Sequence, residues 1–383
     1  MKNIKKIWIA VIVTLLIIIA SFLFGSTSNN TTSTEPIKIG FIAPLTGPAG
    51  AYGEVEKNAV EMALAKINAS GELKRKLEIV YEDGKCSGQD AVTAAQKLIN
   101  IDKVSIILGG LCSSETLAIA PLAEQNKVIV FSAFSSSPDI TKAGDYIFRN
   151  SPSDSDVGKI DADYMISKGY KNVAIISENT DYSQGVRGIM KNVFSNNKIN
   201  IVSDEVFNSG VKDFRTQLTK IKALKPEAIY INPGASPAVA GIIPKQMKEL
   251  GMSDIKIFGN FVFGDKEALN IGGKAMEGII FSDYADLAQS NASIISEYKT
   301  MFQIDPANNY PLMARYDSVF IINNAIKSCG GDDSSCIKKY LYSMKEYNGT
   351  LGAYRFDING DILNKDLAVH KIYQGGVAVV IKN

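Results

Sequence analysis

Residues 37–54 read IKIGFIAPLTGPAGAYGE and hold the pattern from which the fold of this chain follows. A run of β-branched and other apolar residues at 37–42 predicts a buried strand, and the Pro- and Gly-rich segment after it predicts a loop. An amphipathic helical stretch follows at 53–68. A strand, a turn-rich loop and a helix in this order begin a parallel α/β unit.

The same alternation continues along the chain in two rounds. Further early strands are predicted at 76–81, 104–108 and 128–131, with helices at 89–100 and 113–126. A second round of strands and helices begins near residue 154 and reaches about residue 258. Two such units predict two lobes, each a mainly parallel sheet flanked by helices, with a cleft between them. The end of the chain reads as a small antiparallel meander with strands at 353–356, 367–373 and 377–381.

Composition excludes several classes of function. The chain has 383 residues, with 46% hydrophobic and 21% charged residues, which is typical of a soluble globular protein. There are 41 basic and 40 acidic residues and no basic patch stands out, so a nucleic-acid-binding role is excluded. Nucleotide-binding, hydrolase and zinc-protease motifs are absent, and His370 is the single histidine. We therefore expect no enzyme, no cofactor and no metal site.

The N-terminal segment differs from the rest of the chain. Lys2, Lys5 and Lys6 precede an uncharged apolar run, IWIAVIVTLLIIIASFLF, at 7–24. Residues 1–25 are therefore either an uncleaved membrane anchor or a cleaved secretory signal. Either form exports the rest of the chain, so we expect an extracytoplasmic location. A Ser/Thr/Asn-rich linker at 26–36 follows.

Export also bears on the four cysteines, Cys86, Cys112, Cys329 and Cys336. In an oxidising compartment the simplest reading is two disulfides, although four cysteines allow three pairings. The alternative, a metal site with four thiolate ligands, requires C-x-x-C-like spacings that the sequence lacks.

Several motifs resemble those of the leucine/isoleucine/valine-binding proteins, which are substrate-binding components of ABC importers with the type I periplasmic binding fold. The resemblance rests on the opening motif at 37–54, YEDGKCSGQDAVTAAQKLI at 81–99, GGLCSSETLAIAP at 109–121 and NTDYSQG at 179–185. These motifs occur in the order of the family, and the similarity extends over nearly all of 37–383.

The resemblance implies how the chain is divided. Three crossovers join the lobes, near 151–154, 282–285 and 348–352. The first lobe is then 37–153 plus 283–350, and the second is 154–282 plus 351–383. The family also pairs the cysteines that match Cys86 and Cys112, which leaves Cys329 to pair with Cys336.

The loop at 111–115 is the first candidate for ligand binding. It follows a buried strand and opens a helix, so its N–H groups and hydroxyls either bind an anion or simply cap the helix. In the family this loop holds the α-carboxylate of the ligand, which implies that Leu111, Cys112 and Ser113 contact it. The resemblance also implies ligand contacts from Phe134 and Ser136.

Tyr52 and Tyr182 match tyrosines that line the cleft of the family. Two positions depart from the family pattern. Phe261 stands where the amino-acid binders place an acid that pairs with the ligand ammonium, and Ala235 or Ser236 replaces a cleft tyrosine.

Because an unpaired buried ammonium is costly, an amino acid can bind only if another acid replaces the missing one. Candidates for that acid are Asp265, Glu178 and Asp181. Otherwise the ligand is an amine-free acid in a pocket that Phe134, Phe261 and Phe263 make apolar, unless Phe263 packs in a lobe core.

The sequence thus predicts a substrate-binding component of an ABC importer that captures a branched-chain or other amino acid, or a related carboxylate. Its partners would be this ligand, the permease subunits and the membrane that holds residues 7–24, and we expect a monomer. The alternative is a ligand-sensing ectodomain of the same fold without a transport role.

Overall fold

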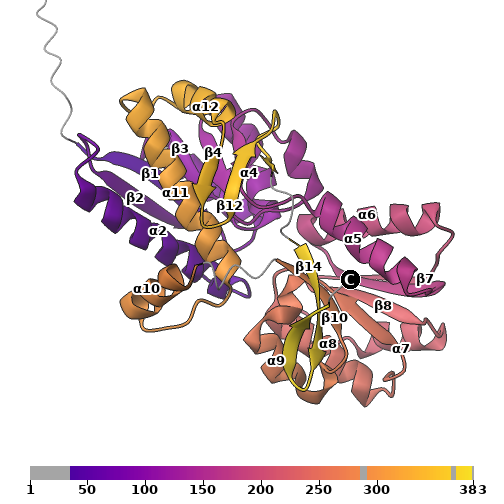
Figure 1. The fold of residues 1–383 in the computed structure, drawn as a ribbon. Helices are drawn as coiled ribbons and strands as arrows, with labels where there is room; N and C mark the ends of the chain where they lie inside the picture. Colours follow the sequence, from indigo (N-terminus) through magenta and orange to yellow (C-terminus); the bar gives the residue numbers. More distant parts are fainter. Residues whose placement is uncertain (1–34, 285–290, 364–367, 382–383) are drawn as a thin grey trace, which may run out of the picture. The chain divides into compact units, whose positions relative to one another are not determined.

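A computed structural model of the chain describes residues 35–284, 291–363 and 368–381. The predicted anchor at 7–24 and most of the linker lie outside these residues. Within the described part of the chain, no helix is both long and apolar enough to cross a membrane. Residues from Pro36 onward form two α/β lobes, each with a mainly parallel sheet between layers of helices (Figure 1), which confirms the predicted fold class.

The first lobe is built on a five-stranded sheet in which all strands are parallel and the order is β2-β1-β3-β4-β5. Its strands are β1 (Ile37–Ala43), β2 (Leu77–Asp83), β3 (Ile106–Gly109), β4 (Ile129–Ser132) and β5 (Ile147–Arg149). Successive residues of a strand face opposite sides of a sheet. Accordingly, Phe41 packs into one core cluster of this lobe and Ile42 into the other.

Helices cover both faces of this sheet. The cluster that contains Phe41 lies under α2 (Gly50–Ser70), α11 (Asn309–Cys329) and α12 (Ser334–Ser343). The opposite cluster lies under α3 (Gly88–Asn100) and α4 (Ser113–Asn126). In Figure 1 the orange helix α11 runs beside the indigo α2, so segments from opposite ends of the sequence form one layer.

The second lobe is built on a seven-stranded sheet with the order β7-β6-β8-β9-β10-β14-β15. Its strands are β6 (Asn172–Glu178), β7 (Asn200–Phe207), β8 (Ala228–Asn232), β9 (Lys256–Gly259), β10 (Ile280–Tyr284), β14 (Ala368–Gln374) and β15 (Val377–Val380). The first five are parallel to one another, whereas β14 and β15 are antiparallel to their neighbours. The helices are α5 (Asp154–Ser167), α6 (Asp181–Asn196), α7 (Arg215–Ala223), α8 (Pro237–Glu249) and α9 (Lys266–Gly272).

Two segments connect the lobes before the C-terminal strands. The first is the segment at 150–153, between β5 and α5. The second follows β10, and beyond residues 285–290, which are not described, α10 (Ala292–Phe302) packs against α2 and α11. The chain therefore returns to the first lobe at this point.

The third crossover differs from the expectation at 348–352. β11 (Tyr347–Gly349), β12 (Gly352–Phe356) and β13 (Ile362–Leu363) form a small antiparallel sheet. Phe356 packs on Phe131 and Phe148 of the first lobe, at 5.5 Å between ring centroids in both cases. The boundary at residue 351 was therefore wrong, and the chain changes lobes after Leu363. The predicted single meander is likewise split, since β14 and β15 join the sheet of the second lobe.

A fully buried ion pair joins the helical layer of the first lobe to its sheet. The Arg315 guanidinium on α11 donates to Glu56 Oε2 on α2, at 2.6 Å from Nη2 and 3.0 Å from Nε. Arg315 Nη1 also donates to the carbonyl of Phe131 on β4 at 2.9 Å. Both side chains have an exposed fraction of 0%. Burial raises the pKa of Glu56, against the lowering effect of Arg315.

We predict that Arg315→Met destabilises the protein by about 3–5 kcal/mol, because it leaves the Glu56 carboxylate buried without its cation. The loss would appear as a lower midpoint of urea unfolding followed by circular dichroism. The double variant Arg315→Met/Glu56→Met removes both charges and should recover part of the loss. Equal midpoints for wild type and Arg315→Met would contradict the stabilising role of the pair.

Candidate functional site

A cavity of about 260 Å³ lies between the lobes, and residues of both lobes line it. Pockets that bind drug-sized molecules have volumes of about 300 Å³ or more, so this cavity suits a small metabolite. The described residues that line it lie at or shortly after the carboxyl ends of strands. From the first lobe they are Pro48, Ala49, Lys85, Cys86, Ser87, Leu111, Cys112, Ser113, Ser114, Phe134 and Ser136. From the second lobe they are Glu178, Thr180, Tyr182, Ser209, Ala235, Ser236 and Phe261.

The amino end of α4 forms the wall on the side of the first lobe. Cys112 is its N-cap, and no hydrogen bond to the backbone N–H of Ser113 or Ser114 is found within the described part of the chain. The positive end of the helix dipole and these N–H groups favour an anion. Ser113 Oγ accepts a hydrogen bond from the Ser137 N–H at 3.1 Å, which fixes the oxygen and leaves the hydroxyl proton for a ligand.

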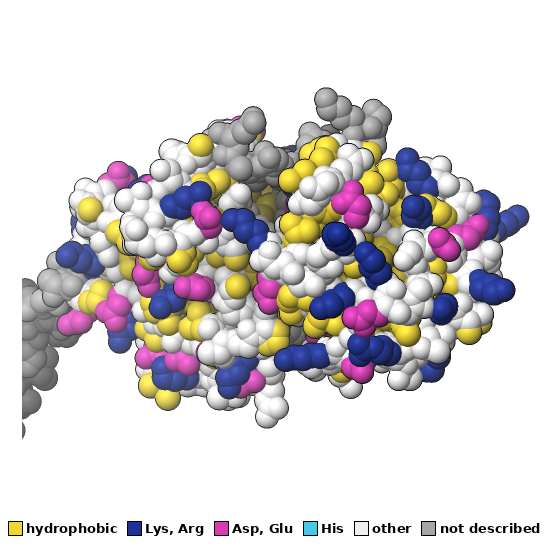
Figure 2. Space-filling view, turned by 90° about the horizontal axis from the view of Figure 1, so that it is seen from below, with side chains coloured by type: hydrophobic (Ala, Val, Ile, Leu, Met, Phe, Trp, Pro, Cys, Tyr) yellow, Lys and Arg dark blue, Asp and Glu magenta, His cyan; other side chains and the backbone are white. Residues whose placement is uncertain are grey.

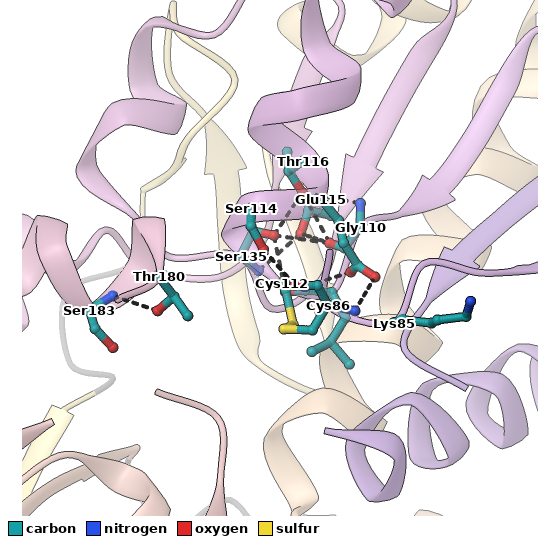
Figure 3. The surroundings of a disulfide bond; sticks show 12 residues. Lys85, Cys86, Gly110, Cys112, Ser114, Glu115, Thr116, Ser135, Thr180 and Ser183 are labelled. Carbon is teal, nitrogen blue, oxygen red and sulfur yellow. Dashed lines mark hydrogen bonds between the residues drawn. A yellow bond between two sulfur atoms is a disulfide. The ribbon is translucent and has the colours of Figure 1, made fainter. Parts of the chain in front are cut away.

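A disulfide and a buried acid hold this wall in place (Figure 3). Cys86, after β2, is bonded to Cys112, with 5.3 Å between their Cα atoms. Glu115 accepts the N–H of Cys86 at 3.0 Å and that of Cys112 at 2.9 Å. Burial raises the pKa of Glu115 to about 7, while these hydrogen bonds lower it. Cys329 and Cys336 are also bonded, between α11 and α12.

The serine-rich loop after β4 forms the adjoining wall. Ser135 Oγ lies 2.7 Å from Thr116 Oγ1 and donates to the Gly110 carbonyl at 3.0 Å, so it serves the structure of the loop. Ser136 lines the cavity, and its carbonyl accepts the N–H of Asp154 at 2.8 Å. The Ser136 hydroxyl also lies near the Asp154 carboxyl group, at the first crossover, and lowers the pKa of that group.

The second lobe faces this wall with an acid, hydroxyls and aromatic rings. Glu178 ends β6 and is only 7% exposed, and the nearby Ser209 hydroxyl favours the charged form of its carboxyl group. Thr180 caps α6 by accepting the N–H of Ser183, and Figure 3 shows this pair across from Cys112. The Tyr182 hydroxyl accepts a hydrogen bond from Asn260 Nδ2 at 2.9 Å, and burial raises its pKa well above the usual value.

Phe261 closes the cavity at its aromatic end. Its ring lies 5.2 Å from that of Phe134 in the first lobe and 6.3 Å from that of Tyr182, between centroids, with edge-to-face geometry in both pairs. Phe263, in contrast, is fully buried in a core cluster of the second lobe. The structure therefore favours the alternative in which Phe263 packs in the core of the second lobe and does not line the pocket.

Tyr52 lies behind the cavity and is absent from the described lining residues. Its ring packs 5.7 Å from that of Phe134, and its hydroxyl donates a hydrogen bond across the lobes to Asp265 Oδ2. Asn308 of the first lobe lies near Asp265 and lowers the pKa of its carboxyl group. Burial raises the pKa of Asp265 to about 7 and that of Tyr52 well above its usual value.

Of the nine predicted ligand-binding residues, the structure brings eight together around the cavity. They are Leu111, Cys112, Ser113, Phe134, Ser136, Tyr182, Ser236 and Phe261. Their contact with a ligand stays a prediction. Tyr52 is the exception: its hydroxyl is engaged between the lobes rather than directed to the cavity.

Sequence reasoning missed Lys85, Ser87, Thr180 and Ser209. Each lies within four residues of the carboxyl end of a parallel strand, and that placement could have identified them. Among the acids that could replace the missing one, Glu178 lines the cavity. Asp265 bonds to Tyr52, and Asp181 is exposed at the start of α6.

The groups that surround the cavity are suited to binding a small molecule. Hydroxyls, helix N–H groups and a carboxylate surround a partly apolar space, which can orient a small polar molecule. In the part of the chain that the structure describes, no group of three or more His, Cys, Asp or Glu side chains is arranged to hold a metal ion. On the face shown in Figure 2, basic and acidic side chains are interspersed rather than gathered by sign.

Comparison with known proteins identifies relatives of the whole described chain. A family model described as "Periplasmic binding protein" matches residues 36–376. A leucine-, isoleucine-, valine-, threonine- and alanine-binding protein of Pseudomonas aeruginosa is 28% identical over 358 residues, covering 91% of this chain and 93% of the relative.

Two solved structures are also similar. One is a branched-chain amino acid transporter substrate-binding protein of Streptococcus pneumoniae in complex with isoleucine, with 28% identity, a TM-score of 0.78 and coverage of 91% and 100% of the two chains. The other is a solute-binding protein of an ABC transporter from Rhodopseudomonas palustris in complex with 3,4-dihydroxybenzoic acid. It has 25% identity, a TM-score of 0.77 and coverage of 91% and 97%.

We predict that Tyr52→Phe favours separation of the lobes, because it removes a hydrogen bond that joins them at a buried carboxyl group. Such a bond contributes about 1.5–3 kcal/mol, or roughly 10- to 100-fold in the closing equilibrium. Small-angle X-ray scattering would report a larger radius of gyration. The control Tyr170→Phe alters a tyrosine that packs on Phe258 within the second lobe. An unchanged radius for Tyr52→Phe would argue against this role.

The carboxyl group of Asp154 generates a prediction about pH. Burial raises its pKa to about 7 from 3.8, and Asp161 adds to the rise, while Ser136 and Arg149 lower it. Between about pH 4 and 7 the folded protein therefore holds a proton that the unfolded chain has lost, so this group makes stability fall as pH rises. The slope is about 1.4 kcal/mol per pH unit at most.

Asp154→Asn should remove this contribution. The free energy of unfolding of the variant minus that of the wild type is expected to be larger at pH 7.5 than at pH 4.5. Urea unfolding at the two pH values would measure this difference. Asp156→Asn, which alters an exposed acid in the same helical turn, is the matched control. The same pH dependence in wild type and Asp154→Asn would disprove the assignment.

Proposed function

The chain belongs to the periplasmic binding protein family, and we propose that it is the extracytoplasmic substrate-binding component of an ABC importer. The relatives from Streptococcus pneumoniae and Rhodopseudomonas palustris are described as solute- or substrate-binding proteins of transporters. Both match at least 91% of this chain, so the likeness covers both lobes. The role is binding and delivery to permease subunits rather than catalysis.

The ligand that we propose is a small carboxylate held between the lobes. The observation that carries this proposal is the amino end of α4, where Ser113 offers both its N–H and its hydroxyl in the cavity wall. A carboxylate suits N–H groups at the positive end of a helix dipole. Isoleucine and 3,4-dihydroxybenzoic acid, the ligands of the two solved relatives, share a carboxylic acid and differ elsewhere.

Binding and lobe closure are coupled in this proposal. The carboxylate contacts the first lobe, while Tyr182 and Phe261 of the second lobe cover the remainder of the ligand. A ligand that contacts both lobes binds the closed arrangement better than an open one and therefore shifts the population toward it. The permease would then receive a closed, ligand-bound protein.

The proposed setting is the outer side of the membrane. An apolar segment at 7–24 that follows three lysines supports export, either as an anchor or as a cleaved signal. Two disulfides, Cys86–Cys112 and Cys329–Cys336, would be stable in that oxidising compartment. We propose a monomer, because one chain supplies both walls of the cavity.

We predict that small carboxylates bind the purified protein and that Ser113→Ala weakens them. Loss of a hydrogen bond to a charged group costs about 1.5–3 kcal/mol, or roughly 10- to 100-fold in Kd. A thermal-shift screen of amino acids, aliphatic acids and aromatic acids would find the ligand, and isothermal titration calorimetry would give Kd.

Ser195→Ala, at an exposed position on α6, is the control and should leave Kd unchanged. If no carboxylate shifts the melting temperature of the wild-type protein, the proposed ligand class is wrong. If Ser113→Ala binds as tightly as wild type, the carboxylate lies elsewhere in the cavity.

A further inference from the structure

Glu178 is the one acidic residue among the described residues that line the cavity. It stands at the carboxyl end of β6, in the wall opposite the amino end of α4. Its side chain is largely buried, with 7% of the residue exposed. A carboxylate at this depth loses much of its hydration and is costly unless a donor or a cation compensates it.

The chain gives Glu178 a hydroxyl but no cation. The Ser209 hydroxyl lies near its carboxylate and favours the charged form. In the described part of the chain, no Lys, Arg or His nitrogen lies within 4.0 Å of its oxygens, although such pairs are found for other acids. Lys85, the basic residue of the cavity, donates to Asp90 Oδ1 at 3.1 Å instead. Burial accordingly raises the pKa of Glu178.

The backbone near Glu178 makes room for its carboxylate. A Cβ atom at Gly234, which has φ +63°, would lie 1.7 Å from Glu178 Oε2. Gln184 Nε2 donates to the Glu178 main-chain carbonyl at 2.8 Å and fixes the end of the strand. The position of the acid is therefore determined by close packing, and any side chain at residue 234 would displace it.

The surroundings of Glu178 also suit a cation. Thr180 and Ser209 supply hydroxyl oxygens, and the rings of Tyr182 and Phe261 lie in the same wall. Aromatic faces attract ammonium groups, and hydroxyl oxygens accept their hydrogen bonds. The other acids near the cavity are occupied or remote, since Asp265 bonds to Tyr52 and Asp181 is exposed.

We propose that Glu178 recognises a protonated amine of the bound ligand, so that the ligand is an amino acid or another carboxylic acid with a cationic nitrogen. The inference rests on the proposed function, because it takes the carboxylate to lie at α4. The amine then pairs with the second lobe and the carboxylate with the first. Closing the lobes assembles a site for both charges, and an acid without an amine leaves Glu178 uncompensated.

Matched ligands test the inference on the full-length wild-type protein. Isothermal titration calorimetry at pH 7 would compare L-leucine with 4-methylpentanoate, which has the same skeleton without the amine. It would also compare 5-aminopentanoate with pentanoate, which places the amine at the far end of the chain. In at least one pair the amine-bearing ligand should bind roughly tenfold or more tightly.

The variant Glu178→Gln should remove this preference. Its Kd for the preferred amine-bearing ligand is expected to rise roughly tenfold or more, while its Kd for the amine-free partner should stay unchanged or fall. Asp181→Asn makes the same change of charge three residues away at an exposed position, and should keep the preference of the wild type. The wild-type comparison stands by itself if Glu178→Gln does not fold.

The outcomes separate this inference from the proposed function. Tight binding of 4-methylpentanoate or pentanoate with no gain from an amine would overturn the inference and leave carboxylate binding intact. A preference for the amine that persists in Glu178→Gln would also overturn it. If none of the four acids binds while the broader screen finds only ligands without a carboxylate, both proposals fail.

Discussion

The parallel direction of the strands is the constraint on which the cavity depends. Four strands of each sheet, β1 to β4 and β6 to β9, end toward it. The ends of these strands, the loops after them and the first turns of the helices that follow supply every described lining residue. A parallel strand must be followed by a crossover, and the crossover helix begins where the strand has just ended. Helix amino ends, with their unpaired N–H groups, therefore gather at the same edge as the loops.

Each lobe brings a different electrostatic character to this edge. The first lobe presents the amino end of α4, held by the Cys86–Cys112 disulfide and Glu115. The second lobe presents Glu178. Outside the cavity, Tyr52 and Asp265 join the lobes through a hydrogen bond that needs no ligand. The free energy of lobe closure thus has two contributions. The Tyr52–Asp265 hydrogen bond belongs to the protein itself, and the contacts of a ligand with the cavity residues add to it.

Local pattern predicted the elements well, because strand and helix periodicity are properties of neighbouring residues. The strands β1 to β4 lie near their predicted positions, and the strands and helices from α5 to β9 occupy the region predicted for the second round, whereas the short strand β5 was not predicted. Most of the cavity wall was predicted from the resemblance to a known family, because the matching motifs include the loops that follow the strands. Thr180 and Ser209 were missed because a lone hydroxyl in a loop has no distinctive pattern.

The differences from the expectations concern contacts between distant segments. Tyr52 stands in the same motif whether it faces a ligand or Asp265, which is 213 residues away. β12 has the same alternating pattern in either lobe, and only its packing on Phe131 and Phe148 assigns it to the first. Local periodicity contains no information about either choice.

The buried pair of Glu56 and Arg315 has a consequence for the order of events during synthesis. The two residues are 259 positions apart, and at about 5–20 residues per second a ribosome needs on the order of tens of seconds to reach the second after the first. Until then the first lobe lacks the helix α11, whose Arg315 neutralises its buried acid. Its core can therefore be completed only when most of the chain has been made.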